Sequence, residues 1–302
     1  MIAELKRHGF RAMGTDVTLL AGLDAPAGAF ARATKQVEWV FSSEERTFSR
    51  FRAESELSLV NANSGEWITV SPRFAELTEY SLQAARETDG LFDPTVLPAM
   101  IAAGYDRDFD EVLAGARGAL HPPEPCGRWR EVELDGRRLR LPSGVGLDFG
   151  GVAKGWTVDL AALTALGCGL DWTIVNAGGD LRIAGRPPER GIDVGVEDPQ
   201  DPEQEAMRLV LDAGALATSS VLARAWGPNL HQLIDPRTGA PAQTGVVQAT
   251  VWGETCARAE ILSKLALLSG PDSLDRCSAA LVLDDGRILT SLDPMVREDV
   301  VA

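Results

Sequence analysis

The sequence predicts an α+β fold in which mixed sheets pack against helices. Some segments alternate apolar and polar residues as strands do, while others repeat apolar residues every three or four positions as amphipathic helices do. The two kinds do not alternate strictly, as a parallel α/β sheet would require. The 302 residues are 45% hydrophobic and 24% charged, which is typical of a globular chain that buries a substantial core. No repeat or linker divides the chain, so we expect one domain over residues 1–302, with insertions.

The first half of the chain contains two predicted helices. Residues 9–22 end in a run rich in Val, Thr and Leu, which indicates a strand, and residues 29–41 have helical spacing. A second helix is expected to begin at Ser71-Pro72, with the serine as its cap, and to end before Asp89-Gly90. Residues 105–128 are polar and rich in Asp, Pro and Gly, so we expect an irregular surface segment there.

The second half contains two predicted hairpins. Short alternating runs flank Asp135-Gly136 and Asp285-Gly286, and such runs around Asp-Gly are a strong hairpin signal. Between the hairpins we expect strands at 172–175, 191–196, 207–211 and 246–252, and helices at about 152–166 and 256–269.

The chain is strongly acidic, with 29 Lys and Arg against 44 Asp and Glu and a net charge of -15. Such a surface repels nucleic-acid phosphates and anionic lipid, so neither is an expected partner, and an anionic ligand would need local donors or a metal. The four cysteines lack metal-ligand spacing, which favours free thiols over a zinc site. We find no secretory signal, no lipidation signal and no apolar run long enough to span a bilayer, so we expect a cytoplasmic location. Export without a recognisable signal stays open as the alternative.

Two glycines, Gly150 and Gly151, precede a predicted helix that carries Lys154 in its first turn. The free N–H groups and the dipole at such a helix start favour an anion. A cation there opposes the dipole, so Lys154 makes sense if a phosphate also binds. An ordinary strand-to-helix turn would explain the glycines equally well. Lys154 is also one of only four lysines among the 29 basic residues, and Lys264 is another.

Three further segments hold polar groups on a constrained backbone. Residues 175–180 place two glycines between polar residues, although an ordinary capped turn has the same pattern. His231 is one of three histidines and precedes the rigid Asp235-Pro236 turn, although a lone histidine is more often structural than catalytic. Phe92-Asp93-Pro94 fixes an acceptor carboxylate, and a helix lead-in would explain it by itself.

In this order and with this spacing, the four segments resemble the ApbE family, the FAD:protein FMN transferases. The resemblance covers about residues 9–270. It also takes in Met13-Gly14-Thr15, the stretch Phe48-Ser49-Arg50-Phe51 with Ser55-Glu56-Leu57 and Asn61, and the block Ala259-Glu260-Ile261-Leu262-Ser263-Lys264.

The resemblance implies an enzyme that binds FAD as its substrate and cleaves the pyrophosphate. The FMN half would move to a threonine hydroxyl of an acceptor protein, and AMP would be released. The resemblance also implies roles for residues: Met13, Phe51, Phe92 and Asp93 would line the flavin or adenine pocket; Gly150, Lys154 and Trp156 would lie at the pyrophosphate; Gly178, Gly179 and Asp180 would form a second glycine loop; His231 and Asp235 would flank the reacting centre.

One departure from the family pattern affects the metal. The family holds Mg²⁺ with an Asp, a Thr four residues later and a backbone carbonyl that matches Ala153, but Glu260 and Lys264 occupy the other two positions. An ammonium cannot ligate a metal. Lys264 is therefore either the partner of Glu260 in an ordinary i,i+4 pair or an ammonium placed where the metal would be. We expect the dependence on Mg²⁺ to be weaker than the family pattern implies.

Three other functions stay open at this point. Water could attack the same site, which would make the protein a FAD pyrophosphatase that gives FMN and AMP. The protein could instead bind FAD without chemistry, or an unrelated α+β protein could match the motifs by chance. Bound FAD, released AMP and flavin attached covalently to an acceptor distinguish these cases in turn.

Overall fold

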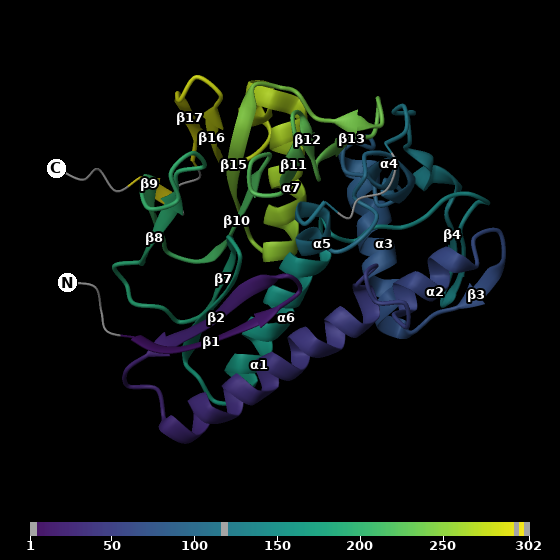
Figure 1. Cartoon of the computed structure of the whole chain (residues 1–302). Coiled ribbons are helices and arrows are strands. Elements are labelled where there is room, and N and C mark those ends of the chain that lie inside the picture. Colours follow the sequence, from purple (N-terminus) through teal and green to yellow (C-terminus); the bar gives the residue numbers. More distant parts are fainter. Residues whose placement is uncertain (1–4, 116–119, 293–295, 299–302) are drawn as a thin grey trace. The chain divides into compact units, whose positions relative to one another are not determined.

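The structure, a computed structural model, describes residues 5–115, 120–292 and 296–298 and confirms the α+β class (Figure 1). The chain forms two compact units, which we describe separately. The single-domain organisation expected from the sequence stays a prediction. Unit 1 comprises Met1–Ser43, Lys154–Leu222 and Gly245–Ala302, and unit 2 comprises Glu44–Ala153 and Ala223–Thr244.

Unit 1 is built on an eight-stranded sheet in which every neighbouring pair of strands is antiparallel. In spatial order its strands are β1 (Leu5–Ala12), β2 (Thr15–Gly22), β6 (Trp172–Ala177), β7 (Asp180–Gly185), β10 (Gly214–Ser220), β15 (Val246–Gly253), β16 (Ala279–Leu283) and β17 (Ile288–Ser291).

Helices cover one face of this sheet and a small sheet covers the other (Figure 1). The helical layer contains α6 (Ala153–Gly167), α7 (Cys256–Ser269) and the part of α1 (Ala27–Phe48) that lies in unit 1. The small sheet has the order β18-β9-β8, and a 3-10 helix, η2, follows α7. These elements span Ile192–Glu197 (β8), Glu205–Leu211 (β9), Val296–Glu298 (β18) and Gly270–Asp275 (η2).

The two-residue period of the strands decides which side chains meet the helices. In β6, Val175 and Ala177 join the core beneath the helices, whereas Ile174 joins the core beneath the small sheet. The same alternation in β7 puts Leu181 on the side of the small sheet, so Asp180 lies on the helical side. A carboxylate is thereby placed under two helices, where water is scarce.

Two hairpin turns lie at one end of the large sheet. Met13-Gly14 joins β1 to β2 and Gly178-Gly179 joins β6 to β7, and all four residues have positive φ, as a type I′ turn requires. A side chain at Gly178 would collide with the Thr15 hydroxyl, so the two turns are packed against each other. Met13, Gly178 and Gly179 therefore have a structural role as turn residues.

In the large sheet, three strands were not predicted from the sequence. Residues 9–22 form most of a hairpin rather than a single strand, and β7 and β10 were not expected at all. The strand β10 is rich in Ala and Ser, which carry little strand preference. Its small side chains are nevertheless buried because α7 packs directly against it.

Unit 2 combines short helices with a three-stranded sheet of order β3-β5-β4 and two small hairpins. Its helices are α2 (Glu56–Ala62), α3 (Pro72–Glu87), α4 (Leu97–Ala102), α5 (Phe109–Leu113) and the 3-10 helix η1 (Arg128–Glu131). Its strands are β3 (Trp67–Thr69), β4 (Glu133–Asp135), β5 (Arg138–Arg140), β11 (Ala225–Gly227), β12 (Leu230–His231), β13 (Ile234–Asp235) and β14 (Ala240–Pro241).

In unit 2, the helix cap and the hairpin predicted from the local sequence are confirmed. Ser71 caps α3 by accepting a hydrogen bond from the Phe74 N–H at 3.2 Å, and the hairpin around Gly136 forms as expected. The segment 105–128 is not irregular throughout, because Asp108 caps the short helix α5. Phe48, Phe74 and Phe149 form an aromatic cluster, with ring centroids 5.5–5.9 Å apart.

A test of the helical packing follows from Gly155. A methyl group there would lie 2.6 Å from the carbonyl oxygen of Cys256, at the start of α7. We expect Gly155→Ala to lower the free energy of unfolding by about 1–3 kcal/mol or more, as overpacking does. Gly167→Ala, in the same helix with nothing within 4 Å of the added methyl, should be neutral or slightly stabilising. Denaturant unfolding measures the free energy of unfolding of both variants. Equal values would contradict the close contact between α6 and α7.

Candidate active site

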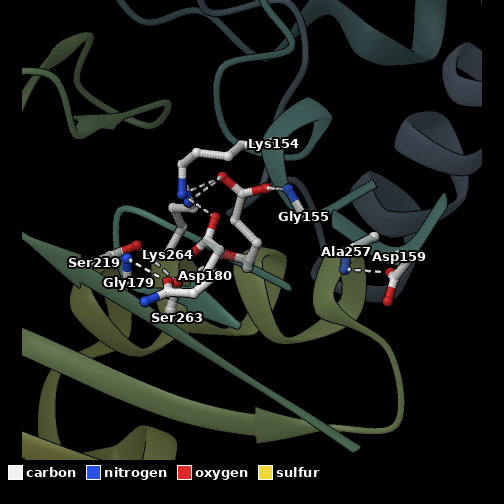
Figure 2. A network of polar contacts seen from close by, with 11 residues as sticks. Lys154, Gly155, Asp159, Gly179, Asp180, Ser219, Ala257, Ser263 and Lys264 are labelled. Atoms are coloured by element: carbon white, nitrogen blue, oxygen red, sulfur yellow. Dashed lines mark hydrogen bonds and ion pairs between the residues drawn. The ribbon is translucent and has the colours of Figure 1, made fainter. Parts of the chain in front are cut away.

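Four charged side chains of unit 1 form a buried cluster, which we call the charge cluster: Lys154, Asp180, Glu260 and Lys264 (Figure 2). Lys154 donates to the Asp180 carboxylate, and its Nζ lies 4.0 Å from Glu260 Oε1. Lys264 Nζ donates to the same Glu260 Oε1 at 3.1 Å. Both carboxylate side chains are 1% exposed, whereas Lys154 is 20% and Lys264 15% exposed.

Each member of the charge cluster is placed by its element. Lys154 lies in the first turn of α6, and Asp180 opens β7 directly after the Gly178-Gly179 turn. Glu260 and Lys264 follow each other by one turn on α7, so they share a face of that helix. Segments that are far apart in the sequence therefore bring two positive and two negative groups together.

A carboxylate already binds at the start of α6. Glu260 Oε2 accepts a hydrogen bond from the Gly155 N–H at 2.8 Å. Asp159 of α6 plays the same part at the start of α7, because its carboxylate accepts from the N–H groups of Cys256 and Ala257, both at 2.9 Å. Figure 2 shows the contact with Ala257. The anion expected at this helix start is therefore present within the chain. The position of Lys154, which suggested a phosphate, is explained by its two carboxylate neighbours.

Burial and charge act against each other on the titrating groups of the cluster. Burial raises the pKa of Asp180 to about 7, although Lys154 opposes the shift. Burial would also raise the pKa of Glu260, but the two lysines and the Gly155 N–H hold the pKa of this carboxyl below its usual value. The pKa of Lys154 is raised by Asp180 and Glu260 in spite of its burial. Lys154 and Glu260 are thus charged at neutral pH.

The residues present do not fit a divalent cation at Glu260. One carboxylate oxygen accepts from the Gly155 N–H and the other from Lys264, whose ammonium cannot be a ligand. Among the described residues, no group of three His, Cys, Asp or Glu side chains could hold a metal ion. In the described part of the chain, no cluster of such side chains therefore accompanies Glu260, and its role as a ligand together with the Ala153 carbonyl stays a prediction.

The loop before α6 differs from the expectation of free donors. The Gly150 N–H donates to Asp148 Oδ1 at 2.7 Å, so this group is already satisfied. Asp148 also pairs with Arg50 Nε at 2.7 Å, and both side chains are more than nine-tenths buried. Gly150 accordingly shapes the turn, and its role at a pyrophosphate stays a prediction.

An aromatic surface of unit 2 surrounds the predicted residue Phe51. The Phe51 ring is 39% exposed, and the guanidinium carbon of Arg50 lies 4.2 Å from its centroid and 4.5 Å from that of Tyr105. Arg50 Nη2 is buried without a hydrogen-bond partner, which marks an unused donor beside two aromatic rings. Arg50 was part of a matched stretch but was given no role, and Tyr105 was missed although tyrosine occurs only twice in the chain.

The two carboxylate oxygens of Asp93 differ in their hydrogen bonds. Its Oδ1 accepts from the Thr95 N–H at 2.7 Å and from the Thr95 hydroxyl at 2.6 Å. Its Oδ2 is buried and has no hydrogen-bond partner, and burial raises the pKa of the carboxyl. Phe92, the preceding residue, is buried. Among the described residues, Asp93 Oδ2 is thus a buried oxygen without a hydrogen-bond partner, and a role of Asp93 at the flavin or adenine stays a prediction.

Both ring nitrogens of His231 contact the backbone. Nε2 lies 3.1 Å from the carbonyl oxygen of Ala242, and Nδ1 accepts from the Leu233 N–H at 3.3 Å. Because a carbonyl only accepts, Nε2 carries the proton, and Nδ1 holds the lone pair. Burial lowers the pKa of His231, which keeps the ring neutral. Asp235 instead pairs with Arg237, at distances of 2.7–3.2 Å, which lowers the pKa of Asp235 despite its partial burial.

The predicted residues fall in both units. Unit 1 holds Met13, Lys154, Trp156, Gly178, Gly179, Asp180 and Glu260. Unit 2 holds Phe51, Phe92, Asp93, Gly150, Ala153, His231 and Asp235. Within unit 1 the structure brings Lys154, Asp180 and Glu260 together with Lys264. The helix-capping role of Asp159 was missed, because nothing in its local sequence points to a partner about one hundred residues away.

The chain is similar in sequence to proteins named FAD:protein FMN transferase. A model of the ApbE family matches residues 13–281. The FAD:protein FMN transferase of Rhodobacter capsulatus is 26% identical over 263 residues, which are 82% of this chain and 50% of that protein, so the chain spans about half of that relative's length. The Chlamydia trachomatis protein of the same name is 28% identical over 246 residues, 78% of this chain and 75% of its own.

Solved structures give the same grouping. The crystal structure of the ApbE protein from Thermotoga maritima is 25% identical and has a TM-score of 0.82, with 95% of this chain and 97% of that chain covered. In the described part of this chain, no helix is both long and apolar enough to cross a membrane.

The neutral state of His231 predicts a pH dependence. Its pKa lies below the usual 6.5 in the folded chain, so below about pH 6.5 the unfolded chain binds a proton that the folded chain does not. The contribution of His231 to stability is therefore present above about pH 6.5 and is lost as the pH falls through the folded pKa. We expect the free energy of unfolding to fall more between about pH 7 and pH 5 in the wild type than in His231→Asn.

Buried carboxylates with a raised pKa, such as Asp93, shift the stability in the opposite direction but are common to both proteins. The difference between the two pH profiles therefore reports His231 alone. Parallel profiles would show that the ring is not held neutral in the folded chain.

Proposed function

The chain belongs to the ApbE family, and we propose that it is a FAD:protein FMN transferase, which moves FMN from FAD to a threonine hydroxyl of an acceptor protein and releases AMP. The observation that carries this proposal is the extent of the family match, residues 13–281, which includes every site residue named above. The relatives from Rhodobacter capsulatus and Chlamydia trachomatis bear the name of this activity. A cytoplasmic location and the lack of a nucleic-acid partner stay predictions from the sequence.

The proposed reaction is a substitution at phosphorus. The threonine oxygen attacks the FMN-side phosphorus of FAD, the bond from that phosphorus to the bridging oxygen breaks, and AMP leaves as the phosphate monoester. The hydroxyl proton passes to a base. The chain must therefore provide positive charge at the pyrophosphate and an acceptor for one proton.

The purified protein with FAD and a threonine-bearing acceptor domain provides the test. Transfer gives a fluorescent acceptor whose mass has increased by one FMN unit, with one AMP for each flavin attached. Equal amounts of free FMN and AMP without flavin on the acceptor would instead identify a FAD pyrophosphatase. FAD binding without release of AMP would identify a protein that binds FAD and does no chemistry. This outcome is included because Lys264 stands where the family pattern has a metal ligand.

We assign the positive charge at the pyrophosphate to Lys154. Its side chain is 20% exposed although its carboxylate partner Asp180 is fully covered, so the ammonium is the accessible member of the pair. Charge-assisted hydrogen bonds from an ammonium to phosphate oxygens are among the stronger contacts that a protein can offer.

Lys154→Ala should weaken FAD binding by about 1–3 kcal/mol, the value of a lost charge-assisted hydrogen bond. Lys35→Ala is the matched control, because Lys35 is an exposed lysine of α1 in the same unit. Calorimetric titration with FAD measures both. Since Lys154→Ala leaves Asp180 buried without its partner, the double variant with Asp180→Asn keeps the test valid if the single variant unfolds. An unchanged FAD affinity would remove Lys154 from the phosphates.

We assign the proton acceptor to His231. The Nδ1 lone pair of His231 accepts a long hydrogen bond, 3.3 Å, from the Leu233 N–H. A substrate hydroxyl could donate to Nδ1 in place of this N–H. A histidine is the side chain best suited to accept a proton near neutral pH. Asp235, held by Arg237, would then fix the turn that follows the histidine and would not take the proton itself.

His231→Asn should reduce turnover about 10²–10⁴-fold, the usual contribution of a general base, while FAD affinity changes little. Steady-state AMP release and calorimetry give the two quantities, and thermal melting shows whether the variant folds. A variant that retains full turnover, or that loses affinity and turnover equally, would make His231 a structural or binding residue.

Phe51 would offer a surface for one of the ring systems of FAD. The exposed Phe51 ring beside the Arg50 guanidinium is a stacking surface with a positive neighbour. The free Arg50 Nη2 and Asp93 Oδ2 are a donor and an acceptor that polar edges of such rings could use.

A further inference from the structure

We propose that Lys264 replaces a divalent cation in the charge cluster, so that flavin transfer by this protein requires no metal. The inference rests on the proposed transferase function and concerns how the same site balances its charge. It starts from the contacts of Glu260, the residue at the position where the family pattern has a metal ligand.

Glu260 already has the partners that a buried carboxylate needs. Its side chain is 1% exposed, one oxygen accepts from the Gly155 N–H at 2.8 Å, and the other accepts from Lys264 Nζ at 3.1 Å. A second ammonium, that of Lys154, lies 4.0 Å from the same oxygen. A metal ion at Glu260 Oε1 would therefore lie directly beside two ammonium groups.

The other carboxylate of the cluster also has an ammonium partner. Asp180 Oδ2 pairs with Lys154, and the Asp180 side chain is 1% exposed. With both carboxylates ionised, the two lysines and two carboxylates sum to zero charge. A divalent cation beside Lys264 would add two positive charges next to an ammonium that the chain cannot remove, and like charges repel strongly where water is scarce.

The accessible side of the charge cluster is cationic. Lys154 and Lys264 are 20% and 15% exposed, whereas the carboxylates are almost fully covered. Figure 2 shows the ends of the two lysine side chains close together, one coming from α6 and the other from α7. An ammonium offsets phosphate charge as a metal does, but it is not a Lewis acid for a phosphoryl oxygen. The protein therefore uses paired ammonium groups to neutralise the pyrophosphate.

The first experiment measures metal binding without FAD. We expect the melting temperature of the wild type to be the same in Mg²⁺ and in EDTA. The double variant Lys264→Thr with Glu260→Asp, which removes the ammonium and shortens the carboxylate, should melt higher in Mg²⁺ than in EDTA. Lys264→Arg, which keeps the charge, is the matched control and should show no difference. A Mg²⁺-dependent melting temperature in the wild type would overturn the inference.

The second experiment measures AMP release from FAD in the presence of a threonine-bearing acceptor. Wild-type rates in Mg²⁺ and in EDTA should agree within about twofold, whereas the double variant should release AMP only with Mg²⁺. A wild-type rate that EDTA lowers about tenfold or more, and that Mg²⁺ restores, would overturn the inference while supporting the transferase. No AMP release in either condition would overturn the transferase, and the melting experiment would then decide the metal question by itself.

Discussion

The helices α6 and α7 hold each other's first turns through carboxylates. Asp159 of α6 accepts from two N–H groups at the start of α7, and Glu260 of α7 accepts from the Gly155 N–H at the start of α6. Each such contact satisfies donors that have no partner within their own helix and is worth about 0.5–2 kcal/mol. The exchange requires the helices to approach closely, and glycine at position 155 permits this, because a methyl group would collide with the Cys256 carbonyl. The rest of the candidate site depends on this contact.

Because Glu260 serves this exchange, a negative charge is buried beneath the helices, and the charge must be balanced there. Two of the chain's four lysines provide the balance, although arginine is far commoner in this sequence. An ammonium is a compact point charge that can fit between two carboxylates, whereas the planar guanidinium needs a wider opening. Asp180 brings a second carboxylate, so the cluster carries no net negative charge. In a chain of net charge -15, the proposed anionic substrate would thus meet a local region that does not repel it.

The sequence revealed the local features of this arrangement but not the long-range ones. The helix caps, the Asp-Gly hairpins and the i,i+4 relation of Glu260 to Lys264 depend on neighbouring residues, and the structure agrees with each of them. The donors at the start of α6 were expected to be free for phosphate, yet the chain's own carboxylates accept from the Gly150 and Gly155 N–H groups. The Gly155 partner lies on α7, more than one hundred residues away, and no pattern in a single sequence identifies it.

The structure shows the i,i+4 pair of Lys264 with Glu260, which is one of the two explanations that the sequence left open, in a buried setting. An i,i+4 pair on an exposed helix face contributes only about 0.2–0.5 kcal/mol, and its lysine could be lost with little effect. Here the carboxylate is 1% exposed, and removing one partner of a buried ion pair costs about 3–5 kcal/mol. The ammonium of Lys264 therefore helps to keep Glu260 buried and charged, together with Lys154 and the Gly155 N–H. The packing of α7 against α6 and the local charge of the candidate site are thus set by the same contacts.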